Sequence, residues 1–370
     1  MTYFSIKKLN EMPEAPALEE IKLPRLLPKI TLTIALIAIV FILLILDLAL
    51  GSVHIPFHEV FNILTGKGSE NIAWLKIIES IRLPKAMTAI LAGVALSLSG
   101  LQMQTLFRNP LAGPSVLGIT AGASLGVAIV MLGSGYVTTS YALQQFGVNG
   151  SWLIITASTL GSALIFVIVM GVSLRIHDNV VLLIVGIMIA NVTIAVVSIW
   201  QYFSGPEQIQ DYLIWTFGSL SGVTQQHLKV MSIAVSAGIL LTFASSKYLN
   251  LLLLGENYAR SMGLNVRLVK ALVIFSTSLM AGAITGFCGP IGFIGIAVPH
   301  LSRSIFNTSD HRVLIPMSCL VGAALMLGCD IIAQLPGSQS MLPINSVTSL
   351  VGSPVVIWVI LKKRNLKAAF

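Results

Sequence analysis

Long apolar segments recur along almost the whole chain, and they constrain its fold more than any other feature. A helix needs about 20 apolar residues to cross a bilayer, whereas a spanning strand shows only a weak alternation. The segments here are continuous, which favours helices. Only 10% of the 370 residues are charged, against roughly 25% in soluble domains, and the mean hydropathy is +0.90. The sequence therefore predicts an all-α integral membrane protein.

About ten segments are long enough, or nearly long enough, to cross the membrane. They are residues 30–50, 84–106, 116–132, 152–174, 180–203, 228–244, 266–283, 291–305, 313–332 and 347–361. The segment 291–305 contains Gly292, Gly295 and Pro299, so we expect it to be tilted or broken. Residues 1–29 are too polar for a cleaved signal peptide and are interpreted as a cytoplasmic tail. Residues 30–370 are interpreted as a single transmembrane domain.

The basic residues predict the orientation of these ten helices. If the N-terminus is inside, five of the 22 lysines and arginines fall outside, which leaves 17 inside. The five are Lys67, Lys76, Arg82, Lys85 and Lys229. Cytoplasmic loops of membrane proteins carry such an excess of positive charge, so we expect both termini in the cytoplasm. The net charge of +8 is then explained without a nucleic-acid partner.

The chain lacks the residue patterns of an enzyme or a metalloprotein. No glycine-rich loop followed by Lys and Ser or Thr is present to hold the phosphates of ATP. The three cysteines, Cys288, Cys319 and Cys329, show no metal-ligand spacing, and the six histidines are scattered. We therefore expect no catalytic residue, no metal site and no cofactor bound by this chain. If ATP and magnesium drive its activity, a partner chain must bind them.

Glycines four residues apart predict one tight helix contact. Gly118, Gly122 and Gly126 would share a helix face, and such spacing lets two backbones approach closely in lipid.

A short polar stretch, "GENYARSMGLN", interrupts the apolar segments. It carries Glu256 and Arg260 four residues apart and is framed by Gly255 and Gly263. The charge pair is favourably ordered but worth only about 0.2–0.5 kcal/mol, and Gly263 suits a left-handed helix end. The pattern predicts a small amphipathic helix on the cytoplasmic surface, with Ala259, Tyr258, Met262 and Val266 on one side. A solvated connector and a partner contact both remain open.

Four separated phrases carry a resemblance to a known family. They are "RLPKAMTAILAGVALSLSGLQMQTLFRNPLAGPSVLGITAGA" from Arg82, "LGENYARSMGLNV" from Leu254, "GPIGFIGIAVPHLSR" from Gly289 and "LPINSVTSLVGSP" from Leu342. In this order they resemble the permease subunits of type II ABC importers, which take up iron–siderophore, haem and cobalamin complexes. The resemblance covers nearly all of the chain after the N-terminal tail.

The resemblance implies a fold of ten helices in a multi-pass protein of the bacterial inner membrane. It implies a homodimer, or a heterodimer with a paralogous permease, in contact with membrane lipid. Two ABC ATPase subunits would drive it, and a periplasmic or lipid-anchored substrate-binding protein would feed it. The function expected is import of an iron chelate, a siderophore or haem, by alternating access. The alternatives are a cobalamin importer permease and an ion-coupled secondary transporter, for which Asp47 and Asp330 are the acidic candidates within spans.

The resemblance also implies roles for particular residues. A coupling helix near 255–264 would contact the ATPase through Gly255, Glu256, Ala259, Arg260 and Gly263. Arg82 and Lys85 would dock the binding protein, or else anchor the loop at the membrane edge. Asn109, Leu111 and Asn179 would lie near the cytoplasmic gate. The chain departs from the family pattern at Gln334, Met341 or Leu342, and Asn345. All of these lie on the expected outer side, where they put the docking of a binding protein in doubt.

Overall fold

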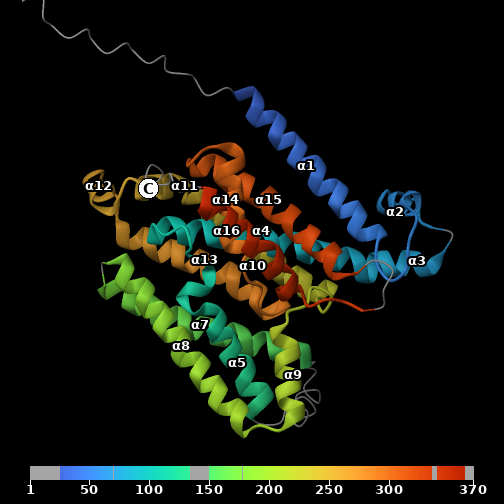
Figure 1. The fold of residues 1–370 in the computed structure, drawn as a ribbon, viewed down its shortest axis with the longest axis horizontal. Coiled ribbons are helices and arrows are strands. Elements are labelled where there is room, and N and C mark those ends of the chain that lie inside the picture. Colours follow the sequence, from blue (N-terminus) through green and yellow to red (C-terminus); the bar gives the residue numbers. More distant parts are fainter. Residues whose placement is uncertain (1–25, 70, 134–149, 177, 336–339, 363–370) are drawn as a thin grey trace, which may run out of the picture.

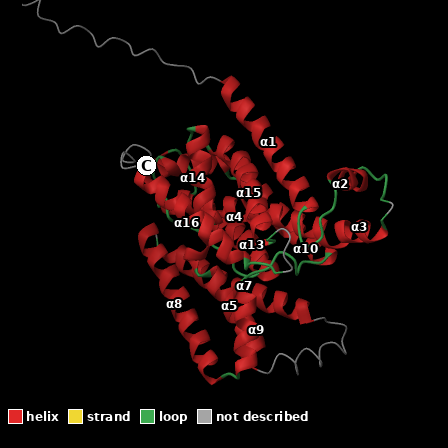
Figure 2. Cartoon of the chain, turned by 45° about the vertical axis from the view of Figure 1, so that its right-hand side comes forward, coloured by secondary structure: helices red, strands yellow, loops and turns green. Residues whose placement is uncertain are grey.

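The structure is a computed structural model that describes residues 26–69, 71–133, 150–176, 178–335 and 340–362. Within these residues, every regular element is a helix (Figure 2). The predicted tail, residues 1–29, lies almost entirely outside the described residues, except that the first helix begins at Leu26.

Ten helices coincide with the ten apolar segments, so the predicted all-α membrane fold is confirmed. They are α1 (Leu26–Ala49), α4 (Leu83–Phe107), α5 (Ile119–Gly133), α7 (Gly150–Arg175), α8 (Asn179–Phe203), α10 (Gln225–Ala244), α13 (Val266–Cys288), α14 (Ile294–Phe306), α15 (His311–Ala333) and α16 (Ile344–Lys362). Among the described residues, seven helical stretches are long and apolar enough to span a membrane, and α5 and α16 are shorter apolar helices.

Short helices fill the connections. They are α2 (Phe57–Leu64), α3 (Ile72–Ile77), the π-helix η2 (Ile78–Arg82), the 3₁₀-helix η3 (Pro114–Leu117), α9 (Pro206–Thr216), α11 (Ser246–Leu253) and α12 (Glu256–Ser261). In Figure 1, α12 lies at one end of the long helices and α2 and α3 lie at the other.

The core is built around α4, which packs against α13, α14 and α15. In its spanning window 78% of the residues are buried, against 17% in α1. Two glycines allow this packing: a Cβ on Gly93 would lie 2.2 Å from the Gly322 carbonyl oxygen, and one on Gly100 would lie 1.7 Å from that of Gly295. Backbones in direct contact are what small residues permit between membrane helices. By contrast, α1 exposes most of its apolar surface at the edge of the fold (Figure 1).

The predicted glycine contact is present, with one correction. Gly122 and Gly126 of α5 pack against α7, where a Cβ would lie 2.5 Å from the Gly161 oxygen and 1.9 Å from the Ala157 oxygen, respectively. Gly118 does not share this face, because it is the left-handed residue (φ +77°) that separates η3 from α5. A proline at the start of η3 and a 3₁₀ turn replace the first turn of the expected helix.

The segment 291–305 is broken, as its glycines predict. α14 has only 13 residues and is preceded by an irregular turn in which Phe293 adopts φ +65°. The side chain of Asn345 stabilises this turn by accepting a hydrogen bond of 3.0 Å from the Gly292 backbone N–H.

Contacts between connections support the predicted alternation of ten crossings. Expected inner connections meet where Asn250 donates to Asp310 Oδ1 at 2.6 Å. Expected outer connections meet where the Ser219 N–H donates to the Cys288 carbonyl at 2.8 Å, and where Gln225 Nε2 donates to the Glu79 carbonyl at 3.3 Å. The fold thus separates two ends of the bundle. Which end faces the cytoplasm stays a prediction from the basic residues.

Candidate functional site

The predicted coupling helix and one predicted gate residue, Asn179, line the same cavity at the inner end of the fold. The cavity has a volume of about 560 Å³ and is lined by Arg108, Asp178, Asn179 and residues 254–258. Sequence reasoning assigned α12 and Asn179 to two separate features, and the structure brings them together. The loop that leads into Asn179 was expected at the gate as well, and its His177 lies outside the described residues.

Helix α12 folds because glycines mark both of its ends. Gly255 precedes it with φ +107°, and Gly263 follows it with φ +81°. At the C-terminal end, the Gly263 N–H donates to the Arg260 carbonyl at 2.9 Å and the Leu264 N–H donates to the Ala259 carbonyl at 3.0 Å. This pair of bonds is the Schellman arrangement that stops a helix at a left-handed glycine. The predicted amphipathic helix and its glycine end are therefore present.

Glu256 fastens α12 to the rest of the protein. The predicted ion pair with Arg260 exists at 3.6 Å. A shorter pair, which sequence reasoning missed, joins Glu256 Oε1 to Lys270 Nζ at 2.7 Å. Lys270 is buried in α13, so this pair connects α12 to a spanning helix. The spacing of 14 residues gives no periodic signal by which the pair could have been found.

Ala259 requires a correction. It is fully buried, with 0% of its surface exposed, and it belongs to the core cluster of Leu252, Val266 and Val269. The predicted contact of Ala259 with a partner is therefore wrong for this structure, because the chain itself covers the side chain.

The exposed face of α12 differs from the predicted one. Tyr258 is 52% exposed and Met262 is 61% exposed, and Asn257, Arg260 and Ser261 are also exposed. Tyr258 and Met262 were expected to share a face with Ala259 and Val266. The helix ends at Ser261, so Met262 is no longer part of it and does not follow the helical period. The result is a small mixed surface of one aromatic, one thioether and several polar side chains.

The gate residues hold a compact turn at the inner end of α4. Arg108 ends α4 in the left-handed region, with φ +48°. Asn109 Oδ1 then accepts from the Leu111 N–H at 2.9 Å, and Leu111 is exposed. Across from this turn, Asn179 Nδ2 donates to the Leu106 carbonyl at 2.8 Å. Asn179 therefore ties the start of α8 to the end of α4, and the role of these residues as a gate stays a prediction.

A polar relay, made of Asn250, His311 and Thr105, links α11, the helix before α12, to α4 through α15. The His311 N–H donates to Asn250 Oδ1 at 2.8 Å, and His311 Nδ1 lies 2.8 Å from the same oxygen. On the other side of the ring, His311 Nε2 lies 2.8 Å from Thr105 Oγ1 of α4. His311 is fully buried. These three residues are far apart in sequence, so no motif predicted their contact.

Asp310, which precedes α15, completes the relay. Burial alone would raise the pKa of the Asp310 carboxyl, but the Arg312 N–H, the Asn250 amide and the positive charge of Arg312 hold that pKa below its ordinary value. The carboxylate is thus ionised when it accepts the 2.6 Å bond from Asn250.

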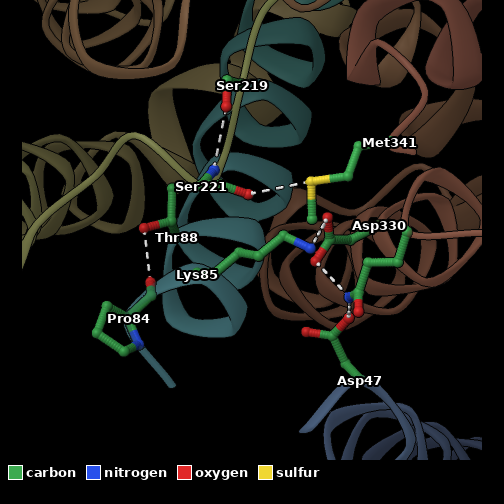
Figure 3. A network of polar contacts seen from close by, with 9 residues as sticks. Asp47, Pro84, Lys85, Thr88, Ser219, Ser221, Asp330 and Met341 are labelled. Atoms are coloured by element: carbon green, nitrogen blue, oxygen red, sulfur yellow. Dashed lines mark hydrogen bonds and ion pairs between the residues drawn. The ribbon is translucent and has the colours of Figure 1, made fainter. Parts of the chain in front are cut away.

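The two residues predicted to dock a binding protein are buried at the outer end. Lys85 Nζ pairs with Asp330 Oδ1 at 3.0 Å. Gln334 Nε2 bridges the two carboxylates, at 2.5 Å from Asp47 Oδ1 and 3.3 Å from Asp330 Oδ2. Figure 3 shows Lys85 pointing at Asp330, with Asp47 coming from the neighbouring helix. This group of four residues, the outer network, connects α1, α4 and α15.

The guanidinium of Arg82 is also bonded within the protein. Its guanidinium donates to the Leu48 carbonyl at 2.7 Å and to the Ala49 carbonyl at 3.0 Å, and it also contacts the Val53 carbonyl. Arg82 and Lys85 are both buried, so neither presents its charge at the surface as expected. Docking of a binding protein at this end stays a prediction, and other side chains would have to make the contact.

The positions that depart from the family pattern divide into two groups. Gln334 and Asn345 are structural, because Gln334 bridges the outer network and Asn345 holds the turn before α14. Met341 and Leu342 are exposed. They line, with Ser219 and Ser221 among others, a pocket of about 220 Å³ that reaches Lys85 and Asp330.

Comparisons with known proteins agree with this arrangement. The model of the FecCD transport family matches residues 38–362. The chain is 37% identical over 322 residues to the vitamin B12 import system permease protein BtuC of Klebsiella pneumoniae, covering 87% of this chain and 90% of that protein. It is 34% identical over 345 residues to the hemin transport system permease protein HmuU of Yersinia pestis, and the match covers 93% of this chain and 99% of that protein.

A solved structure shows a similar fold. It is an inward-facing conformation described as a metal-chelate type ABC transporter, with a TM-score of 0.77 and 26% identity. The match covers 90% of this chain and 99% of that one.

Proposed function

Because the chain belongs to the FecCD transport family and is a permease subunit of an ABC-type importer, we propose that it carries an iron chelate, a siderophore or haem complex. It is a multi-pass protein of the bacterial inner membrane. Both termini are proposed to be cytoplasmic, on the basis of the distribution of basic residues.

Two observations support an iron chelate as the substrate. The hemin permease aligns with 93% of this chain and 99% of its own length, and the similar solved structure is described as a metal-chelate transporter. The vitamin B12 permease, at 37% identity, keeps cobalamin import as the second candidate. All three ligands are large metal complexes, so the fold alone does not choose among them.

Uptake by the reconstituted importer tests the choice. Proteoliposomes with the permease, its ATPase and its binding protein would be given labelled haem, a labelled ferric siderophore or labelled cobalamin. We expect ATP-dependent uptake of one iron chelate and none of cobalamin. Uptake of cobalamin alone would overturn the substrate proposal and leave the importer assignment intact.

The partners follow from the family, which implies ATPase subunits, a substrate-binding protein and a permease dimer. We propose two ATPase subunits that hold ATP and magnesium, and a periplasmic or lipid-anchored binding protein. The permease pair is either a homodimer or a heterodimer with a paralogue. This chain supplies the path and performs no covalent chemistry.

The contacts of α12 support a coupling mechanism. Tyr258 and Met262 form the exposed face that the ATPase would bind. The Glu256–Lys270 pair would pass a movement of α12 to α13. The preceding helix, α11, is connected through Asn250 and His311 to α15 and α4.

At its inner end, α4 holds the turn of Arg108, Asn109 and Leu111. Movement of α12 would therefore reach the proposed gate by two routes, one through α13 and one through α4. This arrangement would let a movement of α12 open or close the proposed gate, as alternating access requires.

The ion-coupled transporter has less support in the structure. Such proteins place ionisable residues at membrane depth, where they bind the coupling ion. Here Asp330 is paired with Lys85 and Asp47 is bonded to Gln334. Uptake that persists without ATP but stops when the proton gradient collapses would favour that rival. We expect the opposite result.

A further inference from the structure

The short helix α2 has more apolar surface than the protein covers. Val60 and Ile63 are buried against the end of α1. Phe57, Phe61 and Leu64 lie at positions i, i+4 and i+7, one beside the other on the helix surface, and all three are exposed, with Phe61 at 55%. His58, Asn62 and Glu59 occupy the remaining part of the helix surface, and His58 is exposed as well. The helix is thus amphipathic, and its apolar side extends beyond its contact with α1.

The backbone holds α2 at the level where α1 leaves the membrane. The Ile55 N–H donates to the Ala49 carbonyl at 3.2 Å, so the connection folds back directly after α1. Arg82 closes the same turn through its bonds to the carbonyls of Leu48, Ala49 and Val53. Because Ala49 is the last residue of the apolar span, α2 begins beside the end of that span.

The position of α2 favours lipid over a protein partner. Both views place it at the rim of the molecule, beside α1 and apart from α9 and α16 (Figures 1 and 2). The outer pocket is lined by residues 217–221, which follow α9, and by Met341 and Leu342, which precede α16. We expect a substrate-binding protein that docks at the outer end to cover this pocket, which α2 does not line. The apolar side of α2 is instead continuous with α1, in whose spanning window only 17% of the residues are buried inside the protein.

We infer that α2 is an interfacial helix, which lies in the surface of the leaflet at the Ala49 end of α1. Phe57, Phe61 and Leu64 contact the boundary between headgroups and acyl chains, while His58 and Asn62 face water. Helices with one apolar and one polar side bind membranes in this way. Lys67, which follows α2, and Lys76, in α3, are exposed in the same connection and can reach lipid headgroups from the interface.

The inferred anchor has a structural role. It fixes the connection between α1 and α4 in the plane of the membrane, and Arg82 joins that connection to the outer end of α1. The relative position of α1 and α4, which share the outer network, is then held by lipid as well as by protein.

Spin labels on α2 test the inference. Single cysteines would replace Phe57, Phe61 or Leu64 on the apolar side, and His58 or Asn62 on the polar side as matched controls. The full permease is labelled in nanodiscs of mixed neutral and anionic phospholipid, and unsubstituted protein provides the background of the three native cysteines. Collisions with oxygen report lipid, and collisions with a water-soluble nickel chelate report water.

We expect the ratio of oxygen to nickel accessibility to be severalfold higher at Phe57, Phe61 and Leu64 than at His58 and Asn62. Equal nickel accessibility on both sides of α2 would overturn the inference. So would a label at Phe61 that is water-accessible in the permease alone and becomes protected only when the substrate-binding protein is added, because that result assigns the surface to a protein partner.

A conservative variant provides an independent measurement. Phe61→Trp keeps an aromatic ring at an exposed position, so the fold is preserved. The added emission, obtained by subtracting that of the unsubstituted protein, should be quenched severalfold more by phospholipid brominated on the acyl chains than by a soluble quencher. Quenching only by the soluble compound would contradict the interfacial position.

Discussion

The two ends of this permease treat their charged residues in opposite ways. At the inner end, α12 exposes Tyr258, Met262 and Arg260 and is held by one buried tie, between Glu256 and Lys270. At the outer end, Lys85 and Arg82 are enclosed, and their partners are carboxylates or carbonyls of the same chain. The inner end is therefore built to present a surface, and the outer end is built to hold three helices together.

This difference shows why charge and position in a loop do not identify a docking site. A cation in a connection is available to a partner only if the chain has no carboxylate or free carbonyl within reach. Lys85 is close to Asp330, which is 245 residues further along the sequence. The same type of residue at α12 stays exposed, because Arg260 finds only a distant oxygen of Glu256, at 3.6 Å.

The largest expected effect comes from removing the buried cation of the outer network. Lys85→Ala removes the cation that pairs at 3.0 Å with the buried carboxylate of Asp330. Breaking a buried pair in this way costs about 3–5 kcal/mol. Thermal unfolding of the purified permease should show a large loss of stability.

The matched control is the double variant Lys85→Met with Asp330→Asn, which removes both charges and should recover much of that loss. A Lys85→Ala protein as stable as the unsubstituted one would show that the outer network does not hold these helices together.

The next effect sharpens the contrast within α12 itself. Ala259→Trp forces a large side chain into the core cluster, and overpacking of this kind costs about 1–3 kcal/mol. The isolated permease should therefore be less stable, before any ATPase is added. Tyr258→Ala, one residue away but exposed, should leave the stability of the isolated permease unchanged. Equal stability of both variants would place Ala259 at the surface, contrary to its burial.

The smallest effects distinguish the two partners of Glu256. Arg260→Ala removes the longer, exposed pair, and its cost should not exceed about 0.5 kcal/mol. Lys270→Met removes the shorter, buried pair and should cost more, about 1–3 kcal/mol, because it leaves the carboxylate of Glu256 without its main charged partner. Stability measured for both variants at two salt concentrations checks the order. If Arg260→Ala cost more than Lys270→Met, Glu256 would be held mainly by its pair within α12 and not by its pair with α13.

Much of the fold could be predicted from the sequence because membrane helices carry a local signal. Each span is a continuous apolar segment, so its limits are visible without knowledge of its neighbours. The same holds for α12, whose two glycines specify its ends, and for the break before α14. Gly118 was misplaced, since the preference of a proline for a 3₁₀ turn competes with the helical period.

The site was less predictable, because its essential contacts are between distant residues. Neither the Glu256–Lys270 pair nor the relay through His311 follows from spacing. The burial of Ala259 depends on how α12 is inclined toward α13, and a helical wheel does not contain that angle. The burial of Lys85 depends on Asp330, which sequence reasoning placed at the same end of the bundle but did not pair with it.

The central claim is that the exposed face of α12 binds the ATPase. Its most direct test is the affinity of the cognate ATPase for the permease in nanodiscs, with Tyr258→Ala and Met262→Ala made singly and together. Loss of a central interface side chain costs more than about 1 kcal/mol, so each variant should weaken binding about fivefold or more, while the stability of the isolated permease stays constant. An affinity unchanged in the double variant would contradict the claim, and α12 would then be only a connector.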